Sequence, residues 1–193
     1  MYACFNQLYK ITPEIFSAWL DILSAREGTV LWLLRFPELG ADNLLEAAKK
    51  RGIDETRIIF SDVAVKKEHI IRCNLADLVL DTENCGMTTN VEVLWSGTPL
   101  LTLLGSSMNS RIGGSLLKGC GLDELCCGTL EEYKEKAMQL ADDPGKLLEL
   151  RRVLEGGRET NPLFDTKKWV KDFEEKITKA VHGHEKGHKL HNV

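Results

Sequence analysis

The chain has 193 residues, of which 43% are hydrophobic and 28% are charged, a composition that suits one globular domain with a full core. Its 25 basic and 29 acidic residues leave a net charge of -4, which argues against general affinity for nucleic acid or anionic membranes. No apolar run has the length of a membrane span, and the N-terminus has neither a basic leader nor an apolar signal core. We therefore expect a soluble, untargeted protein with no membrane or nucleic-acid partner.

The six cysteines are scattered through the chain, and no two of them form a C-x-x-C pair. Most stand in apolar surroundings, which is typical of reduced thiols rather than of disulfides. Thiols of this kind favour a location in the cytoplasm, in the nucleus or in both.

The first hundred residues alternate between short apolar strands and amphipathic helices. The opening strand ends near Phe5, and Thr12-Pro13 then matches a helix N-cap followed by proline at the first helical position. Further strands are expected near 29–36, 57–61, 77–81 and 99–104, and helices over 13–25, 43–51 and 68–75. This alternation predicts an α/β fold with a Rossmann-like parallel sheet and helices on both faces, in which ligands bind at the carboxyl ends of the strands.

The last part of the chain is predicted to be helical, over 110–117, 130–142, 144–154 and 167–180. The final helix carries an apolar stripe of Trp169, Phe173, Ile177 and Val181, which either packs on its own domain or meets a partner. Residues 182–193 hold four of the five histidines, and the two glycines among them argue against a stable helix. We expect one domain over 1–181 and a flexible histidine-rich tail over 182–193, not a metal site.

A strand, a turn and a helix meet between residues 78 and 95. Leu78-Val79-Leu80 is typical of a buried strand, Gly86 supplies a turn, and Thr88 or Thr89 is expected to cap the helix that follows. The free backbone N–H groups and the dipole at such a helix start favour an anion. An ordinary capped helix with no ligand is the alternative interpretation of the same residues.

Two other loops are expected to reach the same edge of the sheet. Gln7 and Lys10 follow the first strand, and Lys66, His69 and Arg72 recur at helical spacing after a later one. Each lysine by itself is typical of a solvated surface, but the convergence of these loops with residues 81–92 predicts an anion pocket.

Other chemistries lack their motifs. There is no G-x-S-x-G elbow, no phosphate-binding G-x-x-x-x-G-K-[ST] loop, no G-x-G-x-x-G fingerprint and no Asp-x-Asp pair, which argues against a kinase, a dehydrogenase or a metal-bound diphosphate. Cys85 lies beside the proposed phosphate turn with no histidine near it in sequence, so we expect it to contact the ligand rather than to act as a nucleophile.

A set of segments in constant order, from residue 2 to about residue 180, resembles the protein O-GlcNAc transferase family. These segments are Phe5-Asn6-Gln7-Leu8-Tyr9-Lys10-Ile11, Val30-Leu31-Trp32-Leu33-Leu34-Arg35-Phe36-Pro37, Arg57-Ile58-Ile59-Phe60-Ser61, Val63-Ala64 with Lys66 and His69, Leu75-Ala76-Asp77, Thr88-Thr89, Val93-Leu94-Trp95, Gly97-Thr98-Pro99 and Pro162-Leu163-Phe164. The resemblance implies the C-terminal, donor-binding lobe of a GT-B glycosyltransferase, followed by C-terminal helices. In such an enzyme UDP-GlcNAc binds without a metal, and GlcNAc passes with inversion to a Ser or Thr hydroxyl of a protein.

The resemblance also implies roles for individual residues. Gln7 and Lys10 would contact the diphosphate, with Lys10 acting in catalysis by stabilising the UDP leaving group. Ala64 would offer backbone hydrogen bonds to uracil, and Arg72 would support the helix that carries the residues flanking the base. The remaining contacts are Lys66 and His69 beside the base, Cys85 near the sugar, Thr88 and Thr89 around phosphate, and Glu92 at the ribose hydroxyls.

The chain departs from the family pattern at two of these positions and in its extent. Met87 stands where the family has a histidine, and Glu92 stands where it has an aspartate, which puts sugar selectivity in doubt more than UDP affinity. The tetratricopeptide repeats and the first catalytic lobe, which would act in cis or in trans, have no counterpart in the 193 residues. Two alternatives stay open: an O-fucosyltransferase lobe that uses GDP-fucose, and a non-catalytic nucleotide-sugar-binding or scaffold protein.

Overall fold

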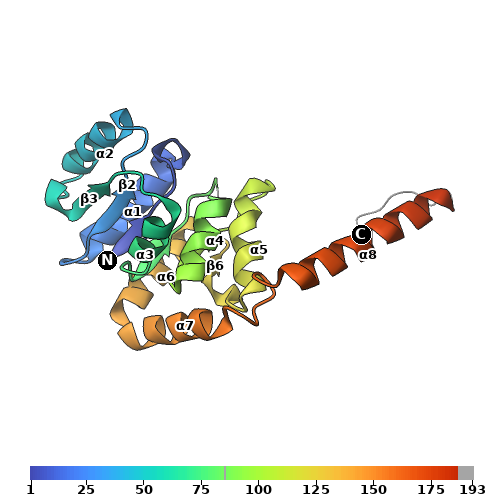
Figure 1. Cartoon of the computed structure of the whole chain (residues 1–193). Helices are drawn as coiled ribbons and strands as arrows, with labels where there is room; N and C mark the ends of the chain where they lie inside the picture. The colour runs from blue at the N-terminus through green and yellow to red at the C-terminus, as the bar shows by residue number, and fades with distance from the viewer. Residues whose placement is uncertain (85, 187–193) are drawn as a thin grey trace.

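The computed structural model describes residues 1–84 and 86–186, and its elements follow the order of an α/β fold (Figure 1). The strands are β1 (Tyr2–Cys4), β2 (Leu31–Leu34), β3 (Ile58–Ser61), β4 (Leu78–Leu80), β5 (Leu100–Leu103) and β6 (Cys126–Cys127). The helices are α1 (Pro13–Ala25), α2 (Leu39–Lys50), α3 (Lys66–Cys73), α4 (Met87–Ser96), α5 (Ile112–Gly119), α6 (Leu130–Asp142), α7 (Pro144–Gly157) and α8 (Thr166–Glu185). Short 3-10 turns include η1 (Leu8–Lys10), which follows the first strand.

The six strands form one parallel sheet in the order β3-β2-β1-β4-β5-β6. Tyr2 of β1 lies opposite Leu31 of β2 on one side and Leu78 of β4 on the other. The strand order therefore reverses between β1 and β4, which is the point where doubly wound sheets open a crevice for ligands. The predicted fold class is confirmed.

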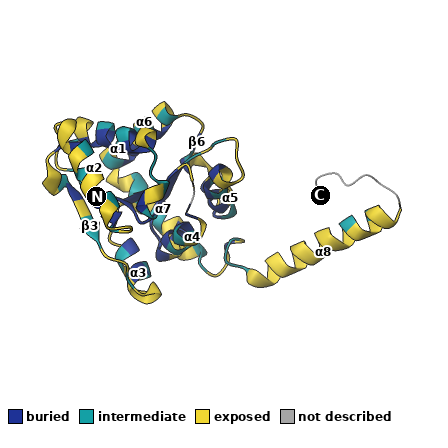
Figure 2. Cartoon of the chain, turned by 90° about the horizontal axis from the view of Figure 1, so that it is seen from above, coloured by how far each residue is buried: buried dark blue, intermediate teal, exposed yellow. Residues whose placement is uncertain are grey.

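Helices cover both faces of the sheet. α1 and α6 pack against each other on one face, and α3, α4 and α5 lie next to one another on the other (Figures 1 and 2). Trp19 of α1 and Tyr133 of α6 are buried together, and the Trp19 indole Nε1 donates to the Tyr133 hydroxyl at 3.2 Å. None of the helices in the described ranges is long and apolar enough to cross a bilayer.

Most element positions agree with the sequence prediction. The helix over 13–25 is confirmed at both ends, because the Thr12 side chain accepts from the Ile15 N–H and Pro13 occupies the first helical position. The four later strands lie inside their expected ranges, whereas the two-residue β6 was not anticipated. Among the described residues the cysteines are free, as expected; they are Cys4, Cys73, Cys120, Cys126 and Cys127.

The last helix differs from expectation in length and in packing. α8 projects from the body of the molecule, and none of its described residues is buried (Figures 1 and 2). Trp169 is 60% exposed and stacks on Phe173, so the interpretation that this stripe packs on its own sheet is wrong. The reason is spatial: the chain leaves the body before Thr166, and α7 already covers α6.

The expected absence of helix after residue 181 is also wrong over its first part. α8 continues through His182, Gly183 and His184, and the Lys186 N–H donates to the His182 carbonyl at 3.2 Å. A glycine within a helix costs only about 1 kcal/mol relative to alanine, too little to end a helix of this length. The rest of the expected tail, 187–193, lies outside the described residues, and the domain division stays a prediction.

Candidate functional site

Two loops that are far apart in sequence meet at the point where the strand order reverses. One follows β1 and contains Asn6, Gln7 and η1, and the other connects β4 to α4. Between them lies a hollow of about 390 Å³. It is lined by Asn6, Gln7, Tyr9, Lys10, Asn84, Gly86, Met87, Thr88, Thr89, Asn109 and Ile112.

The amino end of α4 forms one wall of this hollow. The helix begins at Met87 with Gly86 as its N-cap, so the expectation that Thr88 or Thr89 is the cap is wrong, and both stand in the first turn. No side chain caps this end and no acidic residue lies in the first turn, which leaves the positive end of the helix dipole uncompensated by its own side chains. The hollow is therefore suited to an anion.

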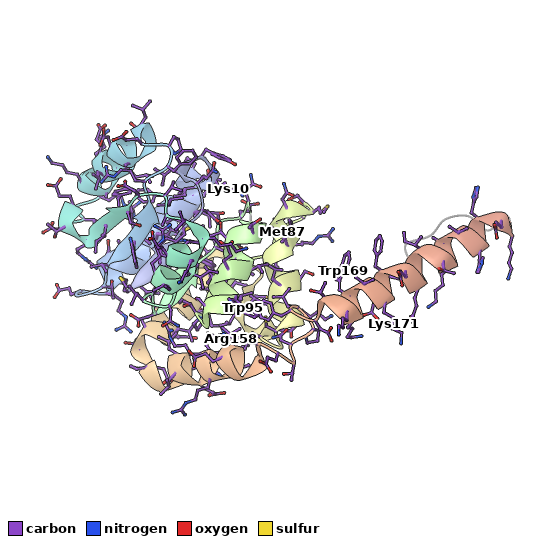
Figure 3. The ribbon with its side chains drawn as sticks, in the orientation of Figure 1. Lys10, Met87, Trp95, Arg158, Trp169 and Lys171 are labelled. Carbon is purple, nitrogen blue, oxygen red and sulfur yellow. The ribbon has the colours of Figure 1, made fainter. Side chains whose placement is uncertain are left out.

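The opposite wall is the short turn after β1. Leu8 is buried and its N–H donates to the Phe36 carbonyl at 2.7 Å, which anchors η1 to the loop after β2. Gln7 and Lys10 flank this anchor and both line the hollow. Figure 3 shows Lys10 and Met87 at the same edge of the molecule, one from each wall. The predicted convergence of the two loops is thus present in the structure.

A second hollow, of about 260 Å³, lies beside the first. It is lined by Phe5, Leu34, Val63, Ala64, Lys66, His69, Arg72, Thr89 and Glu92. Thr89 lines both hollows, so a single elongated ligand that occupied both would lie next to this residue.

His69 is held as a neutral ring. Burial lowers its pKa, the nearby Arg72 guanidinium lowers it further, and the Glu92 carboxylate opposes both effects. The Arg72 Nε donates to His69 Nδ1 at 3.0 Å, so Nδ1 is an acceptor and the proton resides on Nε2. Nε2 lies 3.5 Å from Glu92 Oε2. The ring is therefore oriented with its N–H toward Glu92, and its plane is nearly perpendicular to the Phe5 ring.

Arg72 connects the base of this hollow to the loop before α3. Its guanidinium donates to the Asp62 carbonyl at 2.6 Å and to the Ser61 hydroxyl at 3.2 Å, and it lies over the Phe5 ring. These contacts agree with the supporting role expected for Arg72. At the mouth, the Lys66 ammonium lies 3.3 Å from Glu92 Oε1, which links α3 to α4.

A buried polar cluster beneath the first hollow was missed in the sequence. Asn6 Nδ2 donates to Asp81 Oδ1 at 3.2 Å and to the Thr82 hydroxyl at 2.9 Å, although Asn6 and Asp81 are 75 positions apart. The Thr102 hydroxyl donates to Asp81 Oδ2 at 2.9 Å. The position of Asp81 directly after the apolar run Leu78-Val79-Leu80 was the available signal, because strand ends point into the crevice of such sheets.

Nearly all predicted site residues gather in the two hollows. Gln7, Lys10, Thr88 and Thr89 line the first, and Ala64, Lys66, His69, Thr89 and Glu92 line the second. Cys85 lies outside the described residues. In the part of the chain that the structure describes, no group of three or more His, Cys, Asp or Glu side chains is arranged to hold a metal ion.

Comparison with known proteins identifies the family of the chain. The model of glycosyl transferase family 41 matches residues 1–173. The chain belongs to glycosyl transferase family 41. Among family 41 relatives, it is 46% identical over 186 residues to the Arabidopsis thaliana protein named "Probable UDP-N-acetylglucosamine--peptide N-acetylglucosaminyltransferase SEC", and 38% identical over 190 residues to the Caenorhabditis elegans UDP-N-acetylglucosamine--peptide N-acetylglucosaminyltransferase.

The matches cover almost all of this family 41 chain but a small part of its relatives. The two alignments include 95% and 98% of this chain, and 19% and 16% of the plant and nematode proteins. A solved O-GlcNAc transferase of Thermobaculum terrenum, a lysine-to-methionine variant, superposes with a TM-score of 0.82 at 31% identity, over 91% of this chain and 35% of its own. The Rossmann-like fold is thus shared with a known glycosyltransferase.

Proposed function

We propose that this chain is the donor-binding lobe of a protein O-GlcNAc transferase, which binds UDP-GlcNAc for inverting, metal-independent transfer of GlcNAc to Ser and Thr hydroxyls of proteins. The observation that carries the proposal is the pair of hollows joined at Thr89, one suited to an anion and the other built around a neutral, fixed histidine. A nucleoside diphosphate would match both hollows, because its diphosphate is an anion and its base is a flat ring that can pack against a neutral histidine. Membership of glycosyl transferase family 41 supports a sugar nucleotide as the ligand.

The diphosphate belongs in the first hollow. Lys10 and Gln7 would approach it from the β1 side, and the N–H groups and threonine hydroxyls of the α4 amino end from the other. As the bond to the sugar breaks, negative charge grows on the UDP leaving group. The Lys10 ammonium would stabilise that charge and so act in catalysis.

The uridine belongs in the second hollow. The Ala64 backbone would pair with the edge of uracil, and His69 and Lys66 would flank the ring. The Glu92 carboxylate, held near Lys66 and His69, offers acceptors for the ribose hydroxyls. Because His69 is neutral and fixed in orientation, it can pack against a base without bringing a second positive charge into the hollow.

The sugar would lie at the open side of the first hollow, near Met87, and the family resemblance implies that Cys85 contacts it. Met87 is 56% exposed at the first position of α4, and its thioether can fill space but offers only a weak acceptor where the family has an imidazole. We expect the choice of sugar to be looser than the choice of nucleotide for this reason.

The remaining partners in this proposal come from the resemblance to the protein O-GlcNAc transferase family. A first catalytic lobe and tetratricopeptide repeats, in cis or in trans, would supply the acceptor side and bring the protein substrates. The chain spans about a fifth of the length of the curated relatives it matches, so the complete reaction belongs to the larger assembly.

Calorimetric titration of the purified chain with UDP, UDP-GlcNAc and GDP-fucose tests the proposal. Binding of UDP and UDP-GlcNAc without GDP-fucose is the expected result, and the affinity should be the same with and without EDTA because no metal bridges the diphosphate. Preference for GDP-fucose would support the O-fucosyltransferase alternative. Absence of binding by all three would refute a donor-binding lobe and favour a scaffold role.

A further inference from the structure

Asn6 lies between the two walls of the diphosphate hollow and is itself almost completely buried. It is 3% exposed, and Asp81 next to it is 0% exposed. The Asp81 carboxylate accepts from Asn6 Nδ2, from the Thr82 N–H and from the Thr102 hydroxyl, at distances between 2.9 and 3.2 Å. A carboxylate with these donors fixes the orientation of the Asn6 amide, because only the Nδ2 side can face it.

The same amide connects the β1 turn to the loop that leads into α4. Asn6 Nδ2 also donates to the Thr82 hydroxyl at 2.9 Å, and that hydroxyl donates to the Asn84 carbonyl at 2.9 Å. On one side, Asn6 is the direct neighbour of Gln7. On the other, Asn84 is followed within two positions by Gly86, the N-cap of α4. One side chain thus bridges both walls of the hollow.

The oxygen of the Asn6 amide, Oδ1, packs closely against Gly86 at the start of α4. Asn6 Oδ1 is buried and finds no donor among the described residues. A Cβ atom placed on Gly86 would lie 1.6 Å from this oxygen, so the Asn6 amide occupies the space that any side chain at position 86 would need. Gly86 has a negative φ of -87°, so it is the contact with Asn6, not the backbone conformation, that requires glycine.

The Oδ1 acceptor without a donor lowers the free energy of unfolding, although Nδ2 of the same amide is paired with Asp81 and Thr82. The arrangement therefore indicates a role beyond stability. We propose that Asn6, held by Asp81, is a positioning residue that sets the spacing between the Gln7–Lys10 turn and the amino end of α4, so that both reach one diphosphate. This inference rests on the proposed binding of UDP.

The test compares UDP with uridine, which lacks the phosphates, by calorimetry on the intact chain. Asn6→Ala should weaken UDP binding by about tenfold, or ~1.4 kcal/mol, and uridine binding by less than about threefold. Tyr133→Phe is the matched control, since the Tyr133 hydroxyl donates to the backbone carbonyl of Asp81 at 3.0 Å but Tyr133 does not line the hollow. It should lower the melting temperature and leave both affinities unchanged.

Gly86→Ala and the double variant Asn6→Ala with Gly86→Ala separate positioning from packing. The single change should displace the amide and lower both the melting temperature and UDP affinity. The double variant removes the clash, so its melting temperature should recover while UDP affinity stays about tenfold low. It also serves as the test if Asn6→Ala alone does not fold.

Three results would overturn the inference: equal losses for UDP and uridine, wild-type UDP affinity in the folded double variant, or a selective UDP loss in Tyr133→Phe. Failure of the wild-type chain to bind UDP would instead refute the proposed function, and the inference with it.

Discussion

At the scale of single residues, Lys10 is the side chain whose proposed role depends most on charge. It lines the hollow opposite the amino end of α4, where a diphosphate would lie between two positive groups. Lys10→Ala should weaken UDP binding by about 1.5–3 kcal/mol, the range for a hydrogen bond to a charged group. Lys49→Ala, which removes the same charge from an exposed position on α2, is the calorimetric control. An unchanged dissociation constant in Lys10→Ala would contradict the assignment.

His69 predicts a dependence of stability on pH. Burial and then Arg72 lower its pKa below the ordinary 6.5, so the folded state keeps the ring neutral at pH values where the unfolded chain already takes up a proton. His69 therefore leaves stability intact above about pH 6.5 and reduces it as the pH falls below that value.

Urea unfolding of the wild type and of His69→Gln at about pH 7.5 and pH 5.5 isolates this contribution, because all other groups titrate in both proteins. The wild type should lose more free energy of unfolding on acidification than the variant does. Identical losses in the two proteins would show that His69 is not held neutral.

At the scale of elements, the amino end of α4 offers two kinds of donor to a phosphate. The backbone N–H groups of the first turn belong to any helix start, whereas the hydroxyls of Thr88 and Thr89 belong to this sequence. Replacing both by valine keeps the β-branched shape and the helix start. The double variant should lose roughly 1.5–3 kcal/mol of UDP affinity and little uridine affinity. Equal calorimetric losses for the two ligands would indicate a distorted turn rather than a lost phosphate contact.

α4 and α8 differ in how far the rest of the molecule covers them. α4 is covered by α3, α5 and α7, and its free end reaches the ligand hollow. α8 has a comparable apolar stripe with nothing packed on it in the described structure, and Phe173, Ile177 and Val181 are each about half exposed. A stripe of this size is typical of a surface that meets another domain or chain.

At the scale of the whole molecule, we expect UDP binding and sugar transfer to depend on different parts of the enzyme. The two hollows proposed to bind the donor are built within these residues, whereas the family resemblance implies that a first lobe forms the acceptor side. We expect the purified chain to bind UDP without transferring sugar. Incubation with radiolabelled UDP-GlcNAc and a serine-rich peptide, with and without a separately expressed first lobe, measures this directly. Robust sugar transfer by the chain alone would refute the hypothesis that transfer requires a separate first lobe.

Much of the molecule could be predicted because its signals are local. The signals for the alternating strands and helices, for the Thr12-Pro13 helix start, for Gln7 and Lys10 after a strand, and for Thr88 and Thr89 at a helix start all lie within one or two turns of each other. Hydrophobic periodicity and capping chemistry act over that distance, and the parallel sheet then brings the carboxyl ends of its strands to one edge.

Other features were decided only by the tertiary structure. The bond between Asn6 and Asp81, the close contact of Asn6 with Gly86, the Nε2 tautomer of His69 and the exposure of α8 join or separate residues with no common local pattern. Asn6 and Asp81 meet because β1 and β4 are neighbours in the sheet although 75 positions separate these residues. Local sequence sets which elements form, whereas the order in which strands pair determines which of their ends share a site.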